Sequence, residues 1–343
     1  MIWAIIIFGL LILVHEAGHF AAARWAGITV LEFSIGMGPA LWSTERGGTR
    51  YSLRLLPIGG YVKMDGEDPD QETPPDLPPR GTRRFNEVSL GRRAVVLSAG
   101  ALMNLFCALL VMLALTAGSE FLVSTQVAEL RAGNVSGQAG LAPGDRILRV
   151  DGRRIHIADD IVYAILGAGE APVTMLVERA GQRVQLEGVE FPVQNGRFQP
   201  DFACYRLQKT LPRVLHEGLF RCVGLVREIY LSLFGMLTGQ YGLEDLSGPV
   251  GATQAISEAS KDGFGTLVSF AVFISINLGI FNLLPFPALD GGRLLFLLIE
   301  KLRGRALKPE VEGLFNLVGF ALLMLLVAAV TFRDVANLFR GAA

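Results

Sequence analysis

The stretch MIWAIIIFGLLILVHEAGHFAAA, residues 1–23, decides the fold of this chain. It matches the roughly 20 apolar residues that a helix needs to cross a bilayer, and its only ionisable residues are His15, Glu16 and His19. A signal peptide would begin with basic residues, whereas no Lys or Arg precedes Arg24. The stretch therefore predicts a membrane-spanning helix and not a cleaved leader.

Three further stretches are long and apolar enough to span a membrane. Residues 94–119, 263–289 and 313–332 contain no Asp, Glu, Lys or Arg. Of the 343 residues, 51% are apolar and 18% are charged, with a net charge of −1. This composition excludes a disordered chain, a disulfide scaffold and a nucleic-acid binder driven by net positive charge. The predicted fold is a polytopic α-helical membrane protein with four transmembrane helices.

Basic residues near the helix ends predict the orientation. Residues 24–93 and 290–312 are rich in Arg and Lys and lie on the same side if there are four spans. We expect both in the cytoplasm, with both termini and residues 120–262 outside.

The segments between the spans carry distinct patterns. Glycine-punctuated runs at 28–64 predict β-hairpins, and Pro-rich, acidic residues 65–82 predict an exposed loop. Residues 121–192 predict a compact α+β domain. Its strands are expected at 147–150, 173–177 and 184–186, with a return strand at 155–157, a helix at 159–166 and tight turns at Asp151-Gly152 and Ala180-Gly181. Apolar residues at helical spacing in 212–237 predict an amphipathic helix on the membrane surface. The predicted order is span one at 1–23, hairpins and loop at 24–93, span two at 94–119, external domain at 120–208, amphipathic helix and connection at 209–262, span three at 263–289, cytoplasmic loop at 290–312, span four at 313–332 and external tail at 333–343.

The chemistry is concentrated in the first span. Ionisable groups inside a membrane helix are costly and by default functional. His15 and His19 are four residues apart, so they share a helix face and can bind one metal ion, while Glu16 can reach a metal-bound water. The alternative is a polar contact between helices.

A catalytic zinc site needs a third protein ligand and one open position. The next ionisable residue along the spans is Asp290, in NLLPFPALDGG at 282–292. The prolines of this run cannot continue a regular helix, and unwound backbone at membrane depth requires a protein-lined cavity. Asp290 is therefore the predicted third ligand, although an aspartate before Gly291 also suits an ordinary turn.

These two motifs resemble those of the site-2 protease family of intramembrane zinc metalloproteases, in a form with a single PDZ domain. Further similarity lies in residues 33–38, 56–64, 85–91 and 246–250. The resemblance implies Zn²⁺ as cofactor, His15, His19 and Asp290 as ligands, and Glu16 as general base. It implies that Asn282, and more weakly Asn277, positions substrate or the oxyanion; interhelical hydrogen bonding is the alternative role for both.

The resemblance also implies parts and partners. The hairpins look like the family's membrane-entering β-loop, whose strand edge can pair with an unwound substrate, and residues 120–208 look like one PDZ-like domain. The implied activity is hydrolysis of peptide bonds within or near the transmembrane segments of single-span membrane proteins, such as anti-sigma factors or remnant signal peptides. The implied partners are those substrates and the lipid bilayer, with no nucleic acid or organic cofactor. The implied location is the bacterial cytoplasmic (inner) membrane, with the active site near its cytoplasmic face.

Two departures from the family pattern stand out. The external segment has room for one PDZ domain, whereas some members have two in tandem. Span two has Gly100, Ala101 and Asn104 where the family often has Gly-Pro-x-x-Asn.

Other functions stay open. They are a membrane scaffold that binds peptides and carries a structural metal site, and a metal transporter. The PDZ-like domain either binds a peptide end or excludes bulky substrates. The sequence does not decide whether Cys204 and Cys222 pair.

Overall fold

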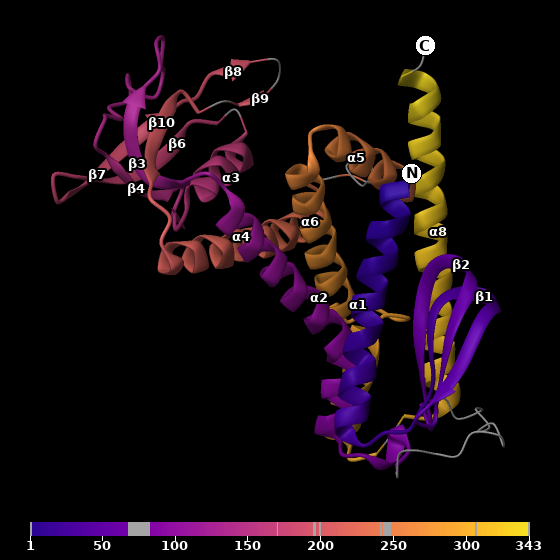
Figure 1. Ribbon diagram of the computed structural model, residues 1–343. Coiled ribbons are helices and arrows are strands. Elements are labelled where there is room, and N and C mark those ends of the chain that lie inside the picture. Colours follow the sequence, from indigo (N-terminus) through magenta and orange to yellow (C-terminus); the bar gives the residue numbers. More distant parts are fainter. Residues whose placement is uncertain are drawn as a thin grey trace. The chain divides into compact units, whose positions relative to one another are not determined.

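The computed structural model describes residues 2–67, 83–169, 171–194, 197–198, 200–240, 242, 248–305 and 307–341 (Figure 1). The chain forms two compact units. The membrane unit comprises Met1–Ala108 and Leu233–Ala343, and the sheet unit comprises Leu109–Ser232. Most of the predicted Pro-rich loop, 68–82, lies outside the described residues.

Four helices in the described part are long and apolar enough to cross a membrane: α1 (Ile2–Ala26), α2 (Leu90–Gly118), α6 (Phe264–Leu283) and α8 (Pro309–Gly341). They confirm the four predicted apolar helices, with shifted ends. In the membrane unit, Ile7 of α1 packs with Ile256 of α5 (Pro249–Lys261) and Leu267 of α6 in one buried cluster. The N-terminus of α1 and the C-terminal end of α8 lie at the same end of this unit (Figure 1).

Three helix boundaries differ from the boundaries of the predicted segments. The third span, expected to reach residue 289, ends at Leu283 because proline follows two residues later, at 285. The predicted loop at 290–312 contains helix α7 (Asp290–Arg303), which ends at Gly304 in the left-handed conformation. The predicted tail after 332 is helical to residue 341, because no proline or glycine stops α8 before that point.

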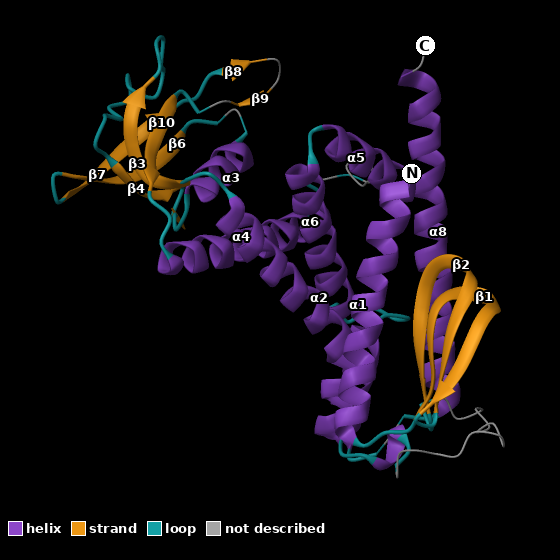
Figure 2. Ribbon diagram, viewed as in Figure 1, coloured by secondary structure: helices purple, strands orange, loops and turns teal. Residues whose placement is uncertain are grey.

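The predicted hairpin region is one long, folded-over antiparallel pair, β1 (Val30–Arg46) and β2 (Thr49–Met64) (Figure 2). Gly47 and Gly48 both have positive φ, as a type I′ turn requires. Residues 32–35 pair with 60–63 on one side and with 50–53 on the other. The first part of β1 is therefore a central strand, with one edge of the sheet formed by the end of β2.

An ion pair fixes the fold of this hairpin. The Arg54 guanidinium donates to Glu32 at 2.8 Å and to the Tyr61 hydroxyl at 2.5 Å. Burial raises the pKa of Glu32, but hydrogen bonds from Ser52 and Arg54 outweigh it and leave the pKa below its usual value. The half-buried carboxylate is thus ionised and holds three parts of the hairpin together.

A short 3-10 helix, η1 (Phe85–Glu87), precedes α2. Phe85 packs in a buried cluster with Val30 of β1, Ala26 of α1 and Val96 of α2. This cluster fixes one end of the hairpin against the two helices that carry much of the candidate site.

The sheet unit contains an antiparallel sheet in the order β10-β3-β4-β6-β7, with β5 beside β4 (Figure 2). Helix α3 (Ala158–Ala168) packs on this sheet, and α4 (Leu211–Leu237) follows β10 in the chain. The strands are β3 (Leu122–Leu130), β4 (Arg146–Val150), β5 (Arg153–Arg154), β6 (Val173–Arg179), β7 (Gln182–Val189), β8 (Val193–Gln194), β9 (Arg197–Phe198) and β10 (Phe202–Leu207). Ile147, Met175 and Val177 are fully buried at the centre of its core.

The predicted strands and turns of this unit are largely confirmed. Asp151 and Ala180 both have positive φ, in the two turns expected from Asp-Gly and Ala-Gly. The predicted return strand was misplaced: β5 covers residues 153–154, because Ile157 is already the N-cap residue of α3. Cys204 and Cys222 are free thiols, and burial raises both pKa values to about 11.

Candidate metal centre

His15, His19 and Asp290 converge in the membrane unit. His15 and His19 are one turn apart on α1, and Asp290 is the first residue of α7. The two Nε2 atoms are 3.2 Å apart, and each is 3.2 Å from Asp290 Oδ2. The tertiary structure therefore brings together the pair and the third residue that the sequence places 271 positions later.

This triangle fits a divalent metal ion. Ligands about 2.0–2.2 Å from a tetrahedral ion lie roughly 3.3–3.6 Å from one another, close to the observed spacing. Asp290 Oδ2 is buried and receives no hydrogen bond in the described part of the chain. Lone pairs crowded this closely are stable only around a cation. Two imidazole nitrogens and a carboxylate form the type of donor set that zinc binds in catalytic sites.

The backbone of α2 fixes the tautomer of His19. Its Nδ1 lies 2.8 Å from the Val96 carbonyl oxygen, which can only accept a hydrogen bond. Nδ1 is therefore the protonated nitrogen, and neutral His19 presents the lone pair of Nε2 to the triangle.

Asn104 plays the matching part for His15, and the sequence analysis did not identify it as a site residue. Its side chain is fully buried, and its amide nitrogen lies 3.4 Å from His15 Nδ1. The amide oxygen is buried without a hydrogen-bond donor in the described part. A half-turn of the amide places this oxygen where it accepts the Nδ1 proton and satisfies both groups. The available signal was a lone Asn in a span otherwise made almost entirely of apolar and small residues.

Gly100 lies between Val96 and Asn104 on the same face of α2, because these three residues follow one another at intervals of four. A Cβ there would collide with His19 Nε2 and lie 2.8 Å from His15 Cε1. Gly18 of α1 packs against the Ala99 backbone in the same way. Glycine thus allows α2 to approach the two imidazoles closely.

Glu16 is next to the triangle but outside it. Its side chain is half-buried and has no hydrogen bond or ion pair in the described part. A Cβ on Gly60 of β2 would lie 3.2 Å from Glu16 Cγ, so the edge of the hairpin runs beside this carboxylate. The Glu16 side chain is therefore free to accept a proton close to the end of β2.

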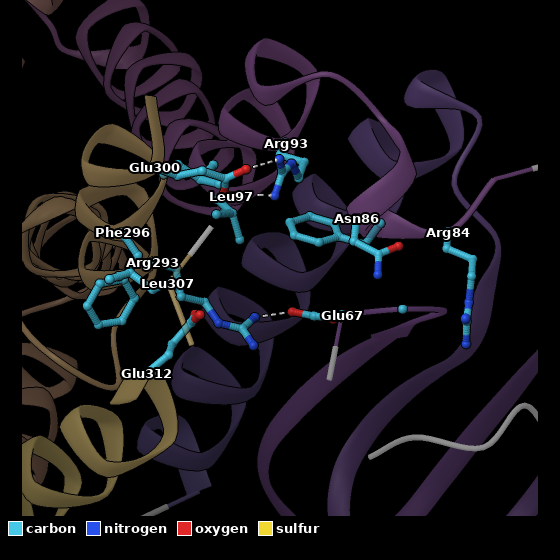
Figure 3. Close-up of a pocket in the computed structure, with 13 residues that line it drawn as sticks. Glu67, Arg84, Asn86, Arg93, Leu97, Arg293, Phe296, Glu300, Leu307 and Glu312 are labelled. Carbon is cyan, nitrogen blue, oxygen red and sulfur yellow. Dashed lines mark hydrogen bonds and ion pairs between the residues drawn. The ribbon is translucent and has the colours of Figure 1, made fainter. Parts of the chain in front are cut away.

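Helix α7 is held firmly, and with it Asp290. Gly291 and Gly292 pack directly against the backbone between α6 and α7. At the other end of α7, Arg93 of α2 donates to both Glu300 oxygens at 2.7 and 3.1 Å. A second ion pair joins Arg293 to Glu67, after the hairpin, and both pairs line a cavity of about 300 Å³ (Figure 3).

The two candidate asparagines of α6 differ. Asn277 Nδ2 donates to the Phe273 carbonyl of its own helix at 3.0 Å, which commits its amide locally. Asn282, in the last turn of α6, makes no side-chain hydrogen bond with any described residue. Its amide is therefore the freer of the two to bind a ligand.

Comparison with known proteins identifies the family. The model of peptidase family M50 matches residues 3–326. A Clostridium perfringens protein that carries a zinc metalloprotease name is 37% identical over 98% of both chains. The zinc metalloprotease RasP of Geobacillus kaustophilus is 31% identical over 98% of this chain and 97% of its own. The regulator of sigma-W protease RasP of Bacillus subtilis is 32% identical over 98% of both. With its four apolar helices, the chain is a bacterial membrane protein and belongs to the metalloproteases of peptidase family M50.

Proposed function

We propose that this protein is an intramembrane zinc metalloprotease of the site-2 type. It hydrolyses peptide bonds within or near the transmembrane segments of single-span membrane proteins. The observation that carries the proposal is the triangle of His15, His19 and Asp290 inside the apolar helices, with Glu16 beside it. Three ligands leave one position open, as catalysis requires, whereas structural zinc sites are usually closed by four.

In this proposal the residues have separate roles. His15, His19 and Asp290 hold the ion, with Val96 and Asn104 orienting the two imidazoles. When bound, zinc supplies a water of lowered pKa and polarises the scissile carbonyl. Glu16 takes the proton from the attacking water and hands it to the leaving amine. Asn282 donates a hydrogen bond to the substrate carbonyl oxygen as negative charge develops there.

The hairpin has a further role in substrate binding. A peptide bond in a transmembrane helix is shielded by its own hydrogen bonds and must unwind before attack. The end of β2 is a sheet edge, and its Gly60 lies beside Glu16. Strand addition to this edge offsets the lost helical bonds and aligns the unwound segment with the general base.

The sheet unit and the orientation complete the proposal. The antiparallel sheet with α3, and the AGLAPGD run at 139–145, support a PDZ domain within residues 120–208. Basic segments 24–93 and 290–312 support a cytoplasmic position for the hairpin side and an external position for both termini, in the cytoplasmic membrane. The name of the sigma-W regulator supports anti-sigma factors as one substrate class.

The test is cleavage of a tagged single-span substrate, already trimmed outside the membrane, by the purified full-length protein. We expect wild type to cut within the span and Glu16→Gln to be about 10²–10⁴-fold slower with its zinc retained. Glu129→Gln, an exposed change in β3, is the matched control and should cut normally. A zinc chelator should stop cleavage by wild type.

Two outcomes would overturn this proposal. Loss of zinc in Glu16→Gln would make Glu16 a ligand and not the base. A folded, zinc-loaded wild type that leaves a panel of unrelated spans uncut would favour a scaffold with a structural metal site.

A further inference from the structure

A cavity of about 500 Å³ opens on the sheet unit and is lined by basic side chains. We call it the arginine groove; its basic residues are Arg146, Arg149, Arg154, Arg183, His156 and His216. No Asp or Glu is among the described residues that line it. Its volume is in the range of small-ligand sites, and its charge suits an anion.

The four arginines of the groove are exposed, and none makes a side-chain hydrogen bond or ion pair with the rest of the described chain. Arg149 on β4 lies directly opposite Arg154 on β5, and like charges in this position destabilise a sheet. Glu178 lies between Arg146 and Arg183 in the register, yet no ion pair joins it to either. The groove thus keeps repelling charges together without an internal counterion.

The groove lies close to the C-terminal end of α2. A second cavity, of about 270 Å³, shares Arg146, His156 and His216 with it and is also lined by residues 122–125. Leu122 follows the end of α2 by four residues, which span at most about 14 Å. If α2 spans the bilayer up to its end at Gly118, the groove lies within reach of the lipid headgroups.

A basic residue also marks the end of this helix. Lys209 donates to the carbonyl oxygens of Ala117 and Ser119 at 3.0 and 2.5 Å. The chain that leads into α4 is therefore fixed to the end of α2, so the start of α4 lies beside the end of this apolar helix.

Helix α4 has the features of a helix that lies in the membrane interface. Apolar side chains recur about every fourth residue and are exposed: Leu211, Leu215, Leu219, Val223 and Tyr230. On its polar face, Arg221 and Arg227 form ion pairs with Asp159 and Asp160 of α3 at 3.1 and 2.9 Å. His216, one residue after the stripe residue Leu215, lines the groove, so the apolar stripe and the basic groove adjoin.

We propose that the arginine groove binds the phosphate headgroup of an anionic phospholipid, with the apolar stripe of α4 in the same leaflet. The groove supplies the charge that complements the phosphate, and the stripe supplies the apolar area. This binding holds the sheet unit against the bilayer surface, and it does not depend on the proteolytic mechanism.

Native mass spectrometry of the full-length protein in a neutral detergent tests this proposal. Phosphatidylglycerol or phosphatidylcholine with the same acyl chains is added in increasing amounts. We expect wild type to prefer phosphatidylglycerol. Arg149→Gln should lower that affinity about five-fold, and Arg149→Gln with Arg154→Gln about twenty-fold, without changing the binding of phosphatidylcholine.

Three controls accompany the groove variants. Arg131→Gln removes an exposed arginine outside the groove and should leave the preference intact. Arg149→Lys keeps the charge and should retain most of the binding. Glycerol phosphate without acyl chains should bind far more weakly, because it cannot use the stripe of α4.

Two results would overturn the proposal. One is the absence of arginine-dependent lipid preference. Wild type would then bind the two lipids equally, or phosphatidylglycerol binding would be unchanged in the folded Arg149→Gln variant and in the folded double variant with Arg154→Gln. The other is arginine-dependent binding of a hexaglutamate peptide in place of the lipid, which would make the groove a site for acidic peptide segments.

Discussion

Asp201 in the sheet unit and Asp290 in the membrane unit both have carboxylate oxygens shielded from water, but different groups lie next to these oxygens. Asp201 accepts hydrogen bonds from the Val135 and Ser136 backbone and from the Ser136 hydroxyl, at 2.6–2.9 Å. Asp290 Oδ2 faces two imidazole nitrogens and receives no hydrogen bond in the described part of the chain.

The other buried aspartates of the sheet unit resemble Asp201. Asp145 is bonded to Arg179 and to the Ala142 backbone, and Asp160 to Arg227 and to two backbone N–H groups. Buried charge is normally satisfied inside the fold because an unpaired charge costs several kcal/mol. The exception at Asp290 supports the proposal that its Oδ2 atom binds a metal ion.

The largest expected effect comes from Asp290→Ala. Removing a proposed ligand should weaken zinc binding by more than about 100-fold and abolish cleavage. Because the remaining imidazoles lose a repulsive neighbour, the metal-free variant should be as stable as the metal-free wild type. Zinc content after dialysis against a zinc buffer, together with the melting temperature of both metal-free proteins, checks this. Full zinc occupancy in the variant would exclude Asp290 as a ligand.

Asp201→Ala should lower the stability of the protein and leave zinc binding unchanged, the reverse of Asp290→Ala. The lost acceptor leaves buried N–H groups of Val135 and Ser136 unpaired, which should cost about 2–4 kcal/mol of the stability of the sheet unit. Zinc content should not change. Hydrogen exchange of sheet amides measures the loss, and Asp201→Asn, which keeps one acceptor oxygen, should lose less. Unchanged exchange in the alanine variant would contradict this account of buried carboxylates.

Gly100→Ala tests the close approach of α2 to the imidazoles. Alanine favours a helix more than glycine, so α2 itself should not be weakened. The new methyl group nevertheless displaces the two imidazoles, and zinc affinity should fall about 10–100-fold. Gly91→Ala, on the same helix with open space around it, is the matched control. Equal zinc affinity in the two variants would show that the imidazoles move freely.

Glu217 sharpens the comparison, because it is a buried carboxylate of the sheet unit with incomplete bonding. One oxygen has no hydrogen bond in the described part and only an ion pair with Arg221 at 3.4 Å. Burial raises the pKa of Glu217 from 4.5 to about 7. The folded state therefore binds more protons than the unfolded state between these values, and stability falls as the pH rises from about 4.5 to 7.

Glu217→Gln should remove this decline and stabilise the protein by about 1–3 kcal/mol above pH 7, with little effect at pH 4.5. Melting temperatures of wild type and variant between pH 4.5 and 8 give the comparison. Glu129→Gln, which is exposed, should leave the pH dependence as in wild type. A constant difference between wild type and Glu217→Gln across this range would show that Glu217 does not titrate there.

Much of the fold follows from local patterns in the sequence. Long apolar stretches predicted four helices, because a bilayer demands about 20 apolar residues for each span. Asp-Gly and Ala-Gly pairs predicted the turns at 151–152 and 180–181. The helix ends were less predictable: α8 continues past the apolar stretch to Gly341, since hydrogen bonding along a helix does not depend on hydropathy.

The candidate ligands could be predicted from the sequence, but the α2 residues that contact the two imidazoles could not. The spacing of His15 and His19 fixed a shared helix face, and the unwound segment before Asp290 indicated a ligand. Only the tertiary structure showed that Val96, Gly100 and Asn104 of α2 face the imidazoles. Which face of an apolar helix packs against another is decided by the mutual fit of side chains, and hydropathy carries no record of it.

The sequence by itself determined the candidate metal-binding pair, the proposed general base and the four apolar helices, because each depends on neighbours within one or two turns. The tertiary structure alone decided the closure of the triangle by Asp290, the tautomer of His19 and the convergence of four arginines on one groove. Each of these joins residues far apart in the chain, and only the folded backbone sets their distances.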